Sequence, residues 1–293
     1  MLDSFFKYLQ FEKRYSPRTI SSYKNDLFQF QQFLSITFEE EDPSKATHGL
    51  IRSWIVQLVE SKMEARSINR KIACLRSFYK FCLKEEVIDK SPMVKIKILK
   101  TQKKLPQFVN EADMAKLLDQ VAFESNFEGL RDRAIIELFY GTGIRLAELI
   151  GLKENQLNLN ERTIKVLGKR NKERIVPFSQ SLVSIIQAYQ KVRRREVEDK
   201  GHDHIFVTKS GAAVYPMMVY RIVKKYLDLF TSVEKRSPHV LRHSFATHLL
   251  NKGAEINAVK DLLGHSSLAA TQVYTHNSME KLKKVFDQAH PKA

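Results

Sequence analysis

Hydrophobic residues recur at helical spacing along residues 1–90 of the chain. Apolar side chains stand three and four positions apart in residues 23–34, 51–59 and 68–83. This period places them on one face of a helix. Ser16-Pro17 and Asp42-Pro43-Ser44 are helix-start signals. The pattern predicts an N-terminal domain, residues 1–90, made of three or four packed amphipathic helices.

The helical pattern is lost in residues 91–109. Five lysines and no acidic residue fall between Lys95 and Lys104, and Pro92 and Pro106 stand on either side. Prolines and a run of like charge are typical of an extended connection between domains. We therefore expect a basic linker over 91–109, either lying on a phosphate backbone or simply solvated.

A second domain, residues 110–293, is expected to be mixed. Helical patterns occupy residues 111–121 and 131–139, and Gly141-Thr142-Gly143 interrupts before a further helix at 144–149. Residues 161–178 alternate β-branched and polar side chains on both sides of a polar turn, which predicts a hairpin. Helical patterns resume at Met217. The expected fold is mainly α with a small β-sheet.

The charge of the chain narrows the kind of partner. Its formal net charge is +16, from 49 Lys and Arg against 33 Asp and Glu. The excess is spread over both predicted domains. Such a surplus indicates a polyanion, most often nucleic acid, or an anionic membrane surface, although basic residues can also serve solubility alone. A target enclosed between two basic domains suits the distribution better than one bound by a basic tail.

Cysteine use and hydropathy indicate a soluble, cytoplasmic protein. Cys74 and Cys82 fall on one predicted helix, and at 1.5 Å per residue they stand roughly 12 Å apart, too far for a disulfide. We expect both to be buried thiols in a reducing compartment. No apolar run is long enough to span a membrane, and the N-terminus does not read as a signal peptide. No metal or nucleotide motif is present.

Several polar residues stand where a helical core does not need them. Arg145 and Glu148 are three apart, so they share a helix face, where a surface ion pair is one reading. His239 and Arg242 show the same spacing at the start of a helix after Pro238. His265 ends the segment LLGH, and Tyr274 follows in the polar segment VYTH. Each of these residues, taken singly, also fits a structural role.

In chain order these motifs resemble those of the tyrosine recombinases of the phage integrase family. The motifs are T-G-I-R-x-x-E-L, a G-K hairpin, H-x-L-R-H-x-F-A-T-x-L, L-G-H and V-Y-T-H. The likeness covers nearly the whole chain and is strongest to the Xer subgroup. It implies an N-terminal SAM-like core-binding domain, which clamps DNA, and a C-terminal catalytic domain. It also implies a closing helix, with Met279, Leu282 and Phe286 at helical spacing, that docks on a neighbouring subunit. The alternative is that this helix packs on its own domain.

The resemblance assigns a role to each matching position. The catalytic residues it implies are Arg145, Lys169, His239, Arg242, His265 and Tyr274. Tyr274 would be the nucleophile that forms a 3′-phosphotyrosine, and Arg145 and Arg242 would bind the phosphate oxygens. His239 would accept the tyrosine proton, Lys169 would protonate the leaving 5′-oxygen, and His265 would donate a hydrogen bond to the phosphate.

The reaction implied by the resemblance needs no cofactor. A covalent phosphotyrosine conserves the energy of the broken bond, so religation requires neither ATP nor a metal ion. The hairpin departs from the usual Gly-Lys-Gly of the family, because Arg170 follows Lys169. Glycine permits positive φ at a turn and arginine resists it. Either the turn differs locally or Arg170 adds a phosphate contact.

Further DNA contacts are expected from the third helix of the N-terminal domain. Its basic residues off the apolar stripe are Arg66, Arg70, Arg76 and Lys80. Judged alone they also fit a solvated polar face. The charge of the whole chain favours phosphate contact.

For the Xer subgroup the resemblance implies resolution of chromosome dimers at a dif site during cell division. The expected assembly is a tetramer, with itself or a paralogous recombinase, on two DNA sites, activated by a DNA translocase. The alternatives are an integrase of a phage, transposon or integron, a type IB topoisomerase, and a sequence-specific DNA-binding protein that does not cut.

Overall fold

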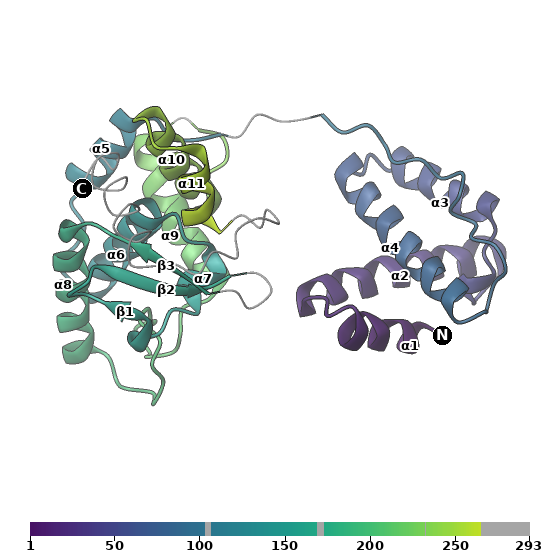
Figure 1. Cartoon of the computed structure of the whole chain (residues 1–293), viewed down its shortest axis with the longest axis horizontal. Helices are drawn as coiled ribbons and strands as arrows, with labels where there is room; N and C mark the ends of the chain where they lie inside the picture. Colours follow the sequence, from purple (N-terminus) through teal and green to yellow (C-terminus); the bar gives the residue numbers. More distant parts are fainter. Residues whose placement is uncertain (103–106, 169–172, 232, 265–293) are drawn as a thin grey trace. The chain divides into compact units, whose positions relative to one another are not determined.

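The computed structural model describes residues 1–102, 107–168, 173–231 and 233–264 (Figure 1). The chain forms two compact units, Met1–Lys104 and Leu105–Ala293. Each unit has its own hydrophobic core.

Helices make up the N-terminal unit. They are α1 (Leu2–Lys7), which runs on as the π-helical turn η1 (Tyr8–Glu12), α2 (Pro17–Phe38), the short η2 (Pro43–Lys45), α3 (His48–Glu60) and α4 (Ala65–Lys84). The start signals act as expected: Ser16 Oγ accepts a hydrogen bond from the backbone N–H of Thr19 at 3.2 Å, and Asp42 accepts from Ser44. The predicted helical bundle is confirmed.

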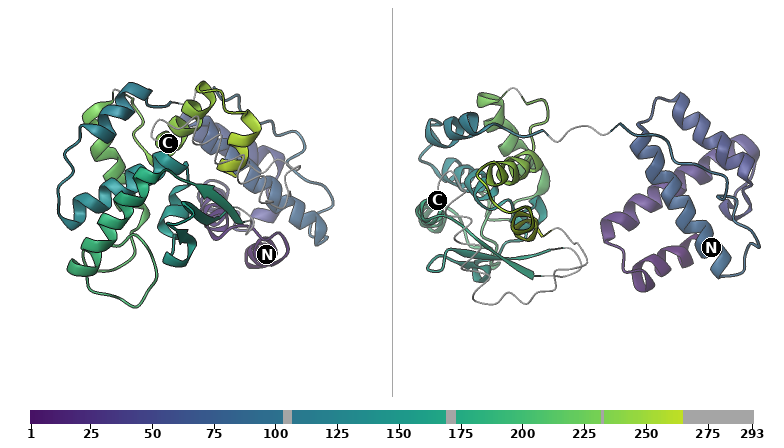
Figure 2. Two further views of the ribbon diagram at one scale, coloured as in Figure 1. Left: turned by 60° about the vertical axis from the view of Figure 1, so that its left-hand side comes forward. Right: turned by 45° about the horizontal axis from the view of Figure 1, so that its top comes forward.

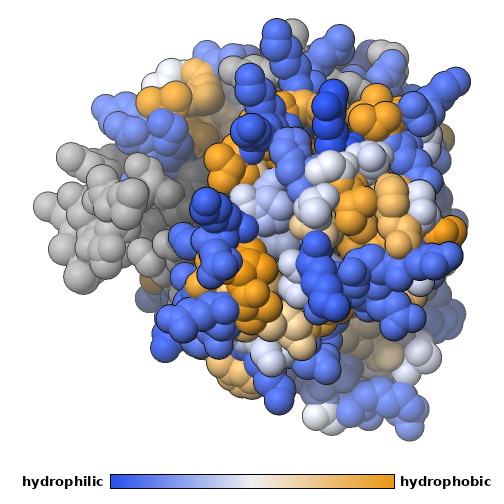
Figure 3. Space-filling view, turned by 90° about the vertical axis from the view of Figure 1, so that its right-hand side faces the viewer, coloured by the Kyte–Doolittle hydropathy of each residue, from blue (hydrophilic) through white to orange (hydrophobic). Residues whose placement is uncertain are grey.

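The apolar stripes of α2, α3 and α4 meet in one core. Phe30 and Trp54 pack with ring centroids 4.8 Å apart, and Phe78 lies edge-on to Phe5. Cys74 and Cys82 are buried here as free thiols. The face of this unit seen in Figure 3 is mostly hydrophilic, with apolar groups in patches between charged side chains.

A buried charge cluster crosses this core between α2 and α4. The Nζ of Lys71 lies 2.9 Å from Oδ1 of Asp26, and both side chains are almost fully buried. The same ammonium group also donates to Gln29 and lies over the ring of Trp54. Arg70 binds the same Oδ1 at 2.9 Å from a half-exposed position. One carboxylate therefore holds two cations.

The first part of the expected linker belongs to the N-terminal unit. Met93 and Ile96 are buried in its core. Arg76 donates to the Ile96 carbonyl at 2.6 Å, and the Asn69 amide exchanges two hydrogen bonds with the backbone of Leu99. The sequence did not predict this packing, because isolated apolar residues among lysines show neither helical nor strand periodicity.

The C-terminal unit combines helices with a small sheet. Its helices are α5 (Glu111–Asp119), α6 (Phe127–Thr142), α7 (Leu146–Ile150), the single turn η3 (Glu154–Gln156), α8 (Gln180–Glu196), α9 (Pro216–Phe230), α10 (Pro238–Asn251) and α11 (Ile256–Leu263). The strands β1 (Leu157–Asn158), β2 (Thr163–Leu167) and β3 (Glu173–Pro177) form an antiparallel sheet in the order β1-β2-β3. The predicted hairpin is confirmed in β2 and β3.

Helix α6 lies at the centre of this unit, between α8 and α10 (Figure 2). It begins four residues before the expected start and runs through Gly141 and Thr142, which the sequence had suggested would interrupt it. Gly143 is its C-cap. Helix α7 then begins at Leu146 rather than at Ile144. Among the described residues no helix is both long and apolar enough to cross a membrane.

Candidate active site

The end of α6 brings a backbone carbonyl to α10. Gly143 has φ +59°, a conformation that favours glycine. A Cβ on it would stand 2.4 Å from the ring of Phe245 in α10 and 2.9 Å from Leu263 in α11. The carbonyl of Gly143 accepts a hydrogen bond from Arg242 Nη1 at 2.5 Å. This glycine therefore allows three helices to meet closely around Arg242.

Arg145 and Glu148 stand at the start of α7. Glu148 Oε2 accepts from the backbone N–H of Arg145 at 2.7 Å, and Oε1 binds the Arg145 guanidinium at 2.8 Å. The carboxylate is 4% exposed and the arginine side chain 24%. A surface ion pair, one reading of this spacing, is wrong: the pair is largely buried.

Arg174 of β3 supplies a second cation to the same carboxylate. Its Nη1 and Nη2 bind the two oxygens of Glu148 at 2.7 and 2.8 Å, in a bidentate pair. Its Nε donates to the Leu262 carbonyl at 2.8 Å. Arg174 is 5% exposed, and its contacts tie the hairpin to both α7 and α11.

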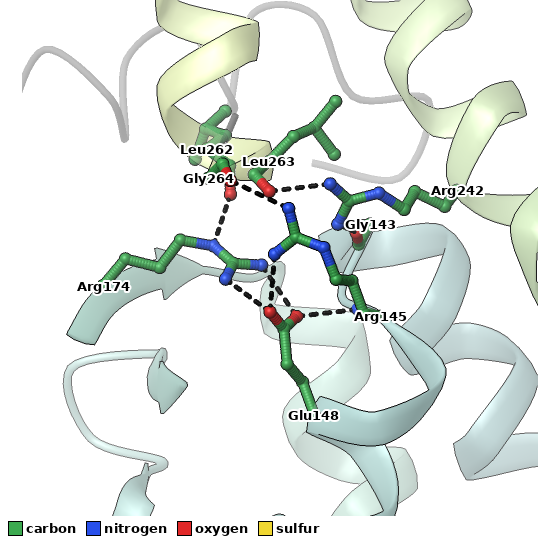
Figure 4. Close-up of polar contacts among 8 residues, drawn as sticks. All are labelled: Gly143, Arg145, Glu148, Arg174, Arg242, Leu262, Leu263 and Gly264. Atoms are coloured by element: carbon green, nitrogen blue, oxygen red, sulfur yellow. Dashed lines mark hydrogen bonds and ion pairs between the residues drawn. The ribbon is translucent and has the colours of Figure 1, made fainter. Parts of the chain in front are cut away.

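The three arginines converge on the C-terminal end of α11 (Figure 4). The carbonyls of Leu262, Leu263 and Gly264 accept hydrogen bonds from Arg174, Arg242 and Arg145, respectively, at 2.7–2.8 Å. The last carbonyls of a helix lack partners within the helix, and cations are favourable beside them. The end of α11 is thereby fixed to α7, β3 and α10, directly before His265.

Positive charge is in excess at this site. Among the described residues that Figure 4 draws, two guanidinium groups bind the single carboxylate of Glu148, and a third, that of Arg242, binds the carbonyls of Gly143 and Leu263 beside them. Burial, together with the positive charges of Arg145 and Arg174, lowers the pKa of Arg242 to about 10. Burial alone would raise the pKa of Glu148, but its bonds to Arg174 and Arg145 hold it at about 2. The cluster is therefore fully ionised at neutral pH and favours an added anion.

His239 lies in the first turn of α10, three residues before Arg242, and is exposed. His243, one turn further along, is also exposed, and partial burial followed by the charges of His239 and Arg242 lowers its pKa. The sequence motif points to His239 and Arg242 but does not single out His243. The described part of the site thus has exposed imidazoles beside a buried guanidinium.

The structure brings together Arg145 and Arg242 of the predicted catalytic residues, with His239 on the same helix as Arg242. The other three, Lys169, His265 and Tyr274, lie outside the described residues, and so do Arg170 and the expected closing helix. Among described residues no group of three or more His, Cys, Asp or Glu side chains could hold a metal ion.

The predicted DNA-contacting residues of α4 are all exposed: Arg66, Arg70, Arg76 and Lys80. Two of them also make contacts within the unit, Arg70 with Asp26 and Arg76 with the Ile96 carbonyl. Such contacts hold part of each guanidinium in place while leaving the side chain accessible. Phosphate contact by these four residues stays a prediction.

Sequence reasoning missed Arg174. The sequence does contain one indication of its burial. Side chains alternate between the two faces of the second hairpin strand, and Arg174 falls on the same face as the buried Val176. A charged residue on the inward face of a strand needs a buried partner. Glu148 is that partner, but it lies too far away in the sequence for a local pattern to reveal the pairing.

Comparisons with known proteins agree over almost the whole chain. The model of the "Phage integrase family" matches residues 107–281, and that of the "Phage integrase, N-terminal SAM-like domain" matches residues 2–86. Tyrosine recombinase XerC of Chlorobaculum parvum is 38% identical over 317 residues, covering 100% of this chain and 94% of that protein. XerC of Bacillus pumilus is 37% identical over 297 residues, with 99% and 95% covered.

Solved structures share the fold. The XerH recombinase bound to a palindromic difH substrate gives a TM-score of 0.71 at 22% identity, covering 97% of this chain and 83% of that one. The XerA recombinase gives 0.50 at 26% identity, covering 100% and 99%. Family models and full-length relatives thus agree with the motifs around the arginine cluster. The chain therefore belongs to the phage integrase family, as a tyrosine recombinase of the Xer type, an enzyme that cuts and rejoins DNA.

Proposed function

We propose that this chain cuts DNA by transesterification, with Tyr274 forming a 3′-phosphotyrosine and releasing a 5′-hydroxyl. The supporting observation is the excess of buried positive charge: three guanidinium groups around one carboxylate. Attack on a phosphodiester adds negative charge to the non-bridging oxygens. A preorganised cationic site stabilises that charge without reorganisation of solvent.

Each proposed residue has one task in this reaction. Arg145 and Arg242 bind the non-bridging oxygens through their planar donor groups. His239 accepts the proton of Tyr274 as its oxygen attacks phosphorus. Lys169 gives a proton to the leaving 5′-oxygen, and His265 donates a hydrogen bond to the phosphate. The reverse attack by a 5′-hydroxyl rejoins the strand and frees the tyrosine.

The test uses a nicked duplex, from which the short strand diffuses away after cleavage and traps the intermediate. Protein and DNA are mixed with EDTA and without ATP, then separated on a denaturing gel. We expect a covalent adduct that is lost in Tyr274→Phe and kept in Tyr15→Phe, a half-exposed tyrosine of the N-terminal unit. An adduct that survives in Tyr274→Phe contradicts the assignment. Tight binding without an adduct favours the DNA-binding protein that does not cut.

We further propose that the target is a dif-type site and that the enzyme resolves chromosome dimers in the cytoplasm during cell division. The curated relatives of similar length are named XerC, and one solved relative is bound to difH. Two duplexes need four cleavages, so the working form is a tetramer, with itself or a paralogue, switched on by a DNA translocase.

The alternative role is integration of a mobile element, because integrases share this fold. A matched pair of nicked substrates, one with a dif-like site and one with the same bases scrambled, separates the roles. Cleavage specific for the dif-like site supports the Xer role. Equal cleavage of both, also in the presence of the host's second recombinase, contradicts it.

A further inference from the structure

Arg174 connects three elements of the site without being one of the residues proposed to bind phosphate. Its guanidinium has three described partners: the two oxygens of Glu148 and the carbonyl of Leu262. Its side chain is 5% exposed. The Cβ position of Gly264 stands 3.1 Å from Arg174 Cδ, so the end of α11 packs directly on its aliphatic stem.

The contacts form a chain that ends at Arg145. Arg174 holds Glu148 in a bidentate pair, and Glu148 in turn holds both the backbone N–H and the guanidinium of Arg145. The guanidinium of Arg145 then binds the carbonyl of Gly264 at 2.8 Å. Arg174 and Arg145 therefore approach the end of α11 from two sides, with Glu148 between them (Figure 4).

A purely structural ion pair would not need this arrangement. Buried ion pairs add little net stability relative to well-packed apolar residues, because desolvation offsets their attraction. Here the pair also adds a third cation to a cluster in which Arg242 already feels the charge of Arg145. Repulsion among the three cations costs stability. The arrangement is useful where an anion has to be bound by arginines held in a fixed geometry.

We propose that Arg174 is a positioning residue for DNA cleavage: through Glu148 it aims Arg145, and through Leu262 it sets the end of α11. The inference rests on the proposed function of the same site. Arg174 itself does not touch DNA. The bond to Leu262 also fixes the last described turn before Gly264, which directly precedes His265 in the sequence.

The test compares Arg174→Lys with Arg193→Lys. Arg193 is a matched control in the same unit, since its Nη1 binds Glu154 at 3.0 Å and the Ile205 carbonyl at 2.9 Å, and it is 15% exposed. Lysine keeps the charge but not the bidentate geometry. We expect the single-turnover rate of adduct formation at saturating DNA to fall about 100-fold in Arg174→Lys. The Kd for the intact duplex should stay close to that of Arg193→Lys.

A second substrate separates positioning from general damage to the fold. A methylphosphonate at the scissile position replaces one charged oxygen by a methyl group, so a precisely aimed guanidinium matters less. We expect the defect of Arg174→Lys to be smaller on this substrate than on the phosphodiester. Equal defects on both substrates, or equal rates for the two lysine variants, would overturn the proposal.

If thermal unfolding shows that Arg174→Lys does not fold, the double variant Glu148→Gln/Arg174→Gln replaces it. This variant removes the carboxylate and one guanidinium together and leaves two neutral amides. A folded double variant that cleaves at the wild-type rate contradicts the proposal, and one that binds DNA but cleaves about 100-fold more slowly supports it. A wild-type protein that forms no adduct contradicts the proposed function instead.

Discussion

Two clusters of buried charge, one in each unit, balance their charges differently. In the N-terminal unit, the almost fully buried Lys71 and Asp26 form a one-to-one pair, and Arg70 joins from a half-exposed position. In the described part of the C-terminal unit, Glu148 faces two arginines directly, and a third, Arg242, binds only carbonyls in the contacts drawn in Figure 4. The buried centre of the first cluster has one charge of each sign, whereas the second cluster has three positive charges and one negative charge among the residues drawn.

This difference separates a structural cluster from a functional one. In a balanced buried pair each charge has its counter-ion within the unit, so the pair has no net charge for a ligand to neutralise. A cluster of cations held by carbonyl dipoles is stable enough to fold, but an added anion lowers its energy further. The comparison therefore predicts that damage to the first cluster lowers stability without slowing cleavage, whereas loss of an arginine from the second cluster slows cleavage by more than any loss of stability explains.

The largest effect on stability is expected for Asp26→Ala. The change leaves the ammonium group of Lys71 buried without its carboxylate, which typically costs about 3–5 kcal/mol. Urea unfolding of the full chain should show this loss. Asp3→Ala, at an exposed position in α1, is the control. If Asp26→Ala is as stable as the wild type but no longer cleaves DNA, the first cluster is functional rather than structural and the comparison is wrong.

Arg242→Gln should mainly lower the rate of cleavage rather than the free energy of unfolding. Loss of one donor to the developing charge costs on the order of 10²–10³ in rate. The rate of adduct formation on the nicked duplex measures it, and Arg221→Gln is a control on the neighbouring helix α9 for loss of a surface charge. A drop in unfolding free energy that accounts for the whole loss of activity would mean that Arg242 is structural.

The pH dependence of stability sharpens the comparison further. Because contacts with Arg174 and Arg145 outweigh burial, the folded pKa of Glu148 is about 2, below its usual 4.5. A lowered folded pKa contributes stability above the unfolded pKa, and this stability is lost as pH falls from about 4.5 toward 2. The contribution is on the order of 3 kcal/mol. Glu148→Gln should flatten the slope of unfolding free energy in this window, and an unchanged slope would contradict the prediction.

The smallest effect is expected at the exposed residues of α4. Lys80→Gln should weaken binding to all DNA sequences alike and reduce the slope of log Kd against log salt by about 1. Fluorescence anisotropy at several salt concentrations measures the slope. Lys7→Gln in α1 is a control of the same type outside α4. A change in sequence preference without a change in slope would mean that Lys80 contacts bases.

The helices of the N-terminal unit and the hairpin could be predicted because they follow from local periodicity, whereas helix α8 was not predicted. The stripe around Phe78 in α4 and the alternation of β2 and β3 survive into the structure almost unchanged. The end of the N-terminal unit could not be predicted, because Met93 and Ile96 pack on residues far away in the sequence. Gly143 was read as part of a break, whereas its positive φ and its close contact with Phe245 make it a cap at a crossing of helices.

For the site, the sequence by itself determined which chemical types are present and in what order: arginine, lysine, histidine, arginine, histidine and tyrosine, in motifs of a known family. Only the tertiary structure decided that Arg145 and Glu148 form a buried pair and that Arg174 is their partner. The physical reason is that side-chain type and period are local properties. Burial and the balance of charge depend on which distant elements meet, and here α7, β3 and α10 meet at the end of α11.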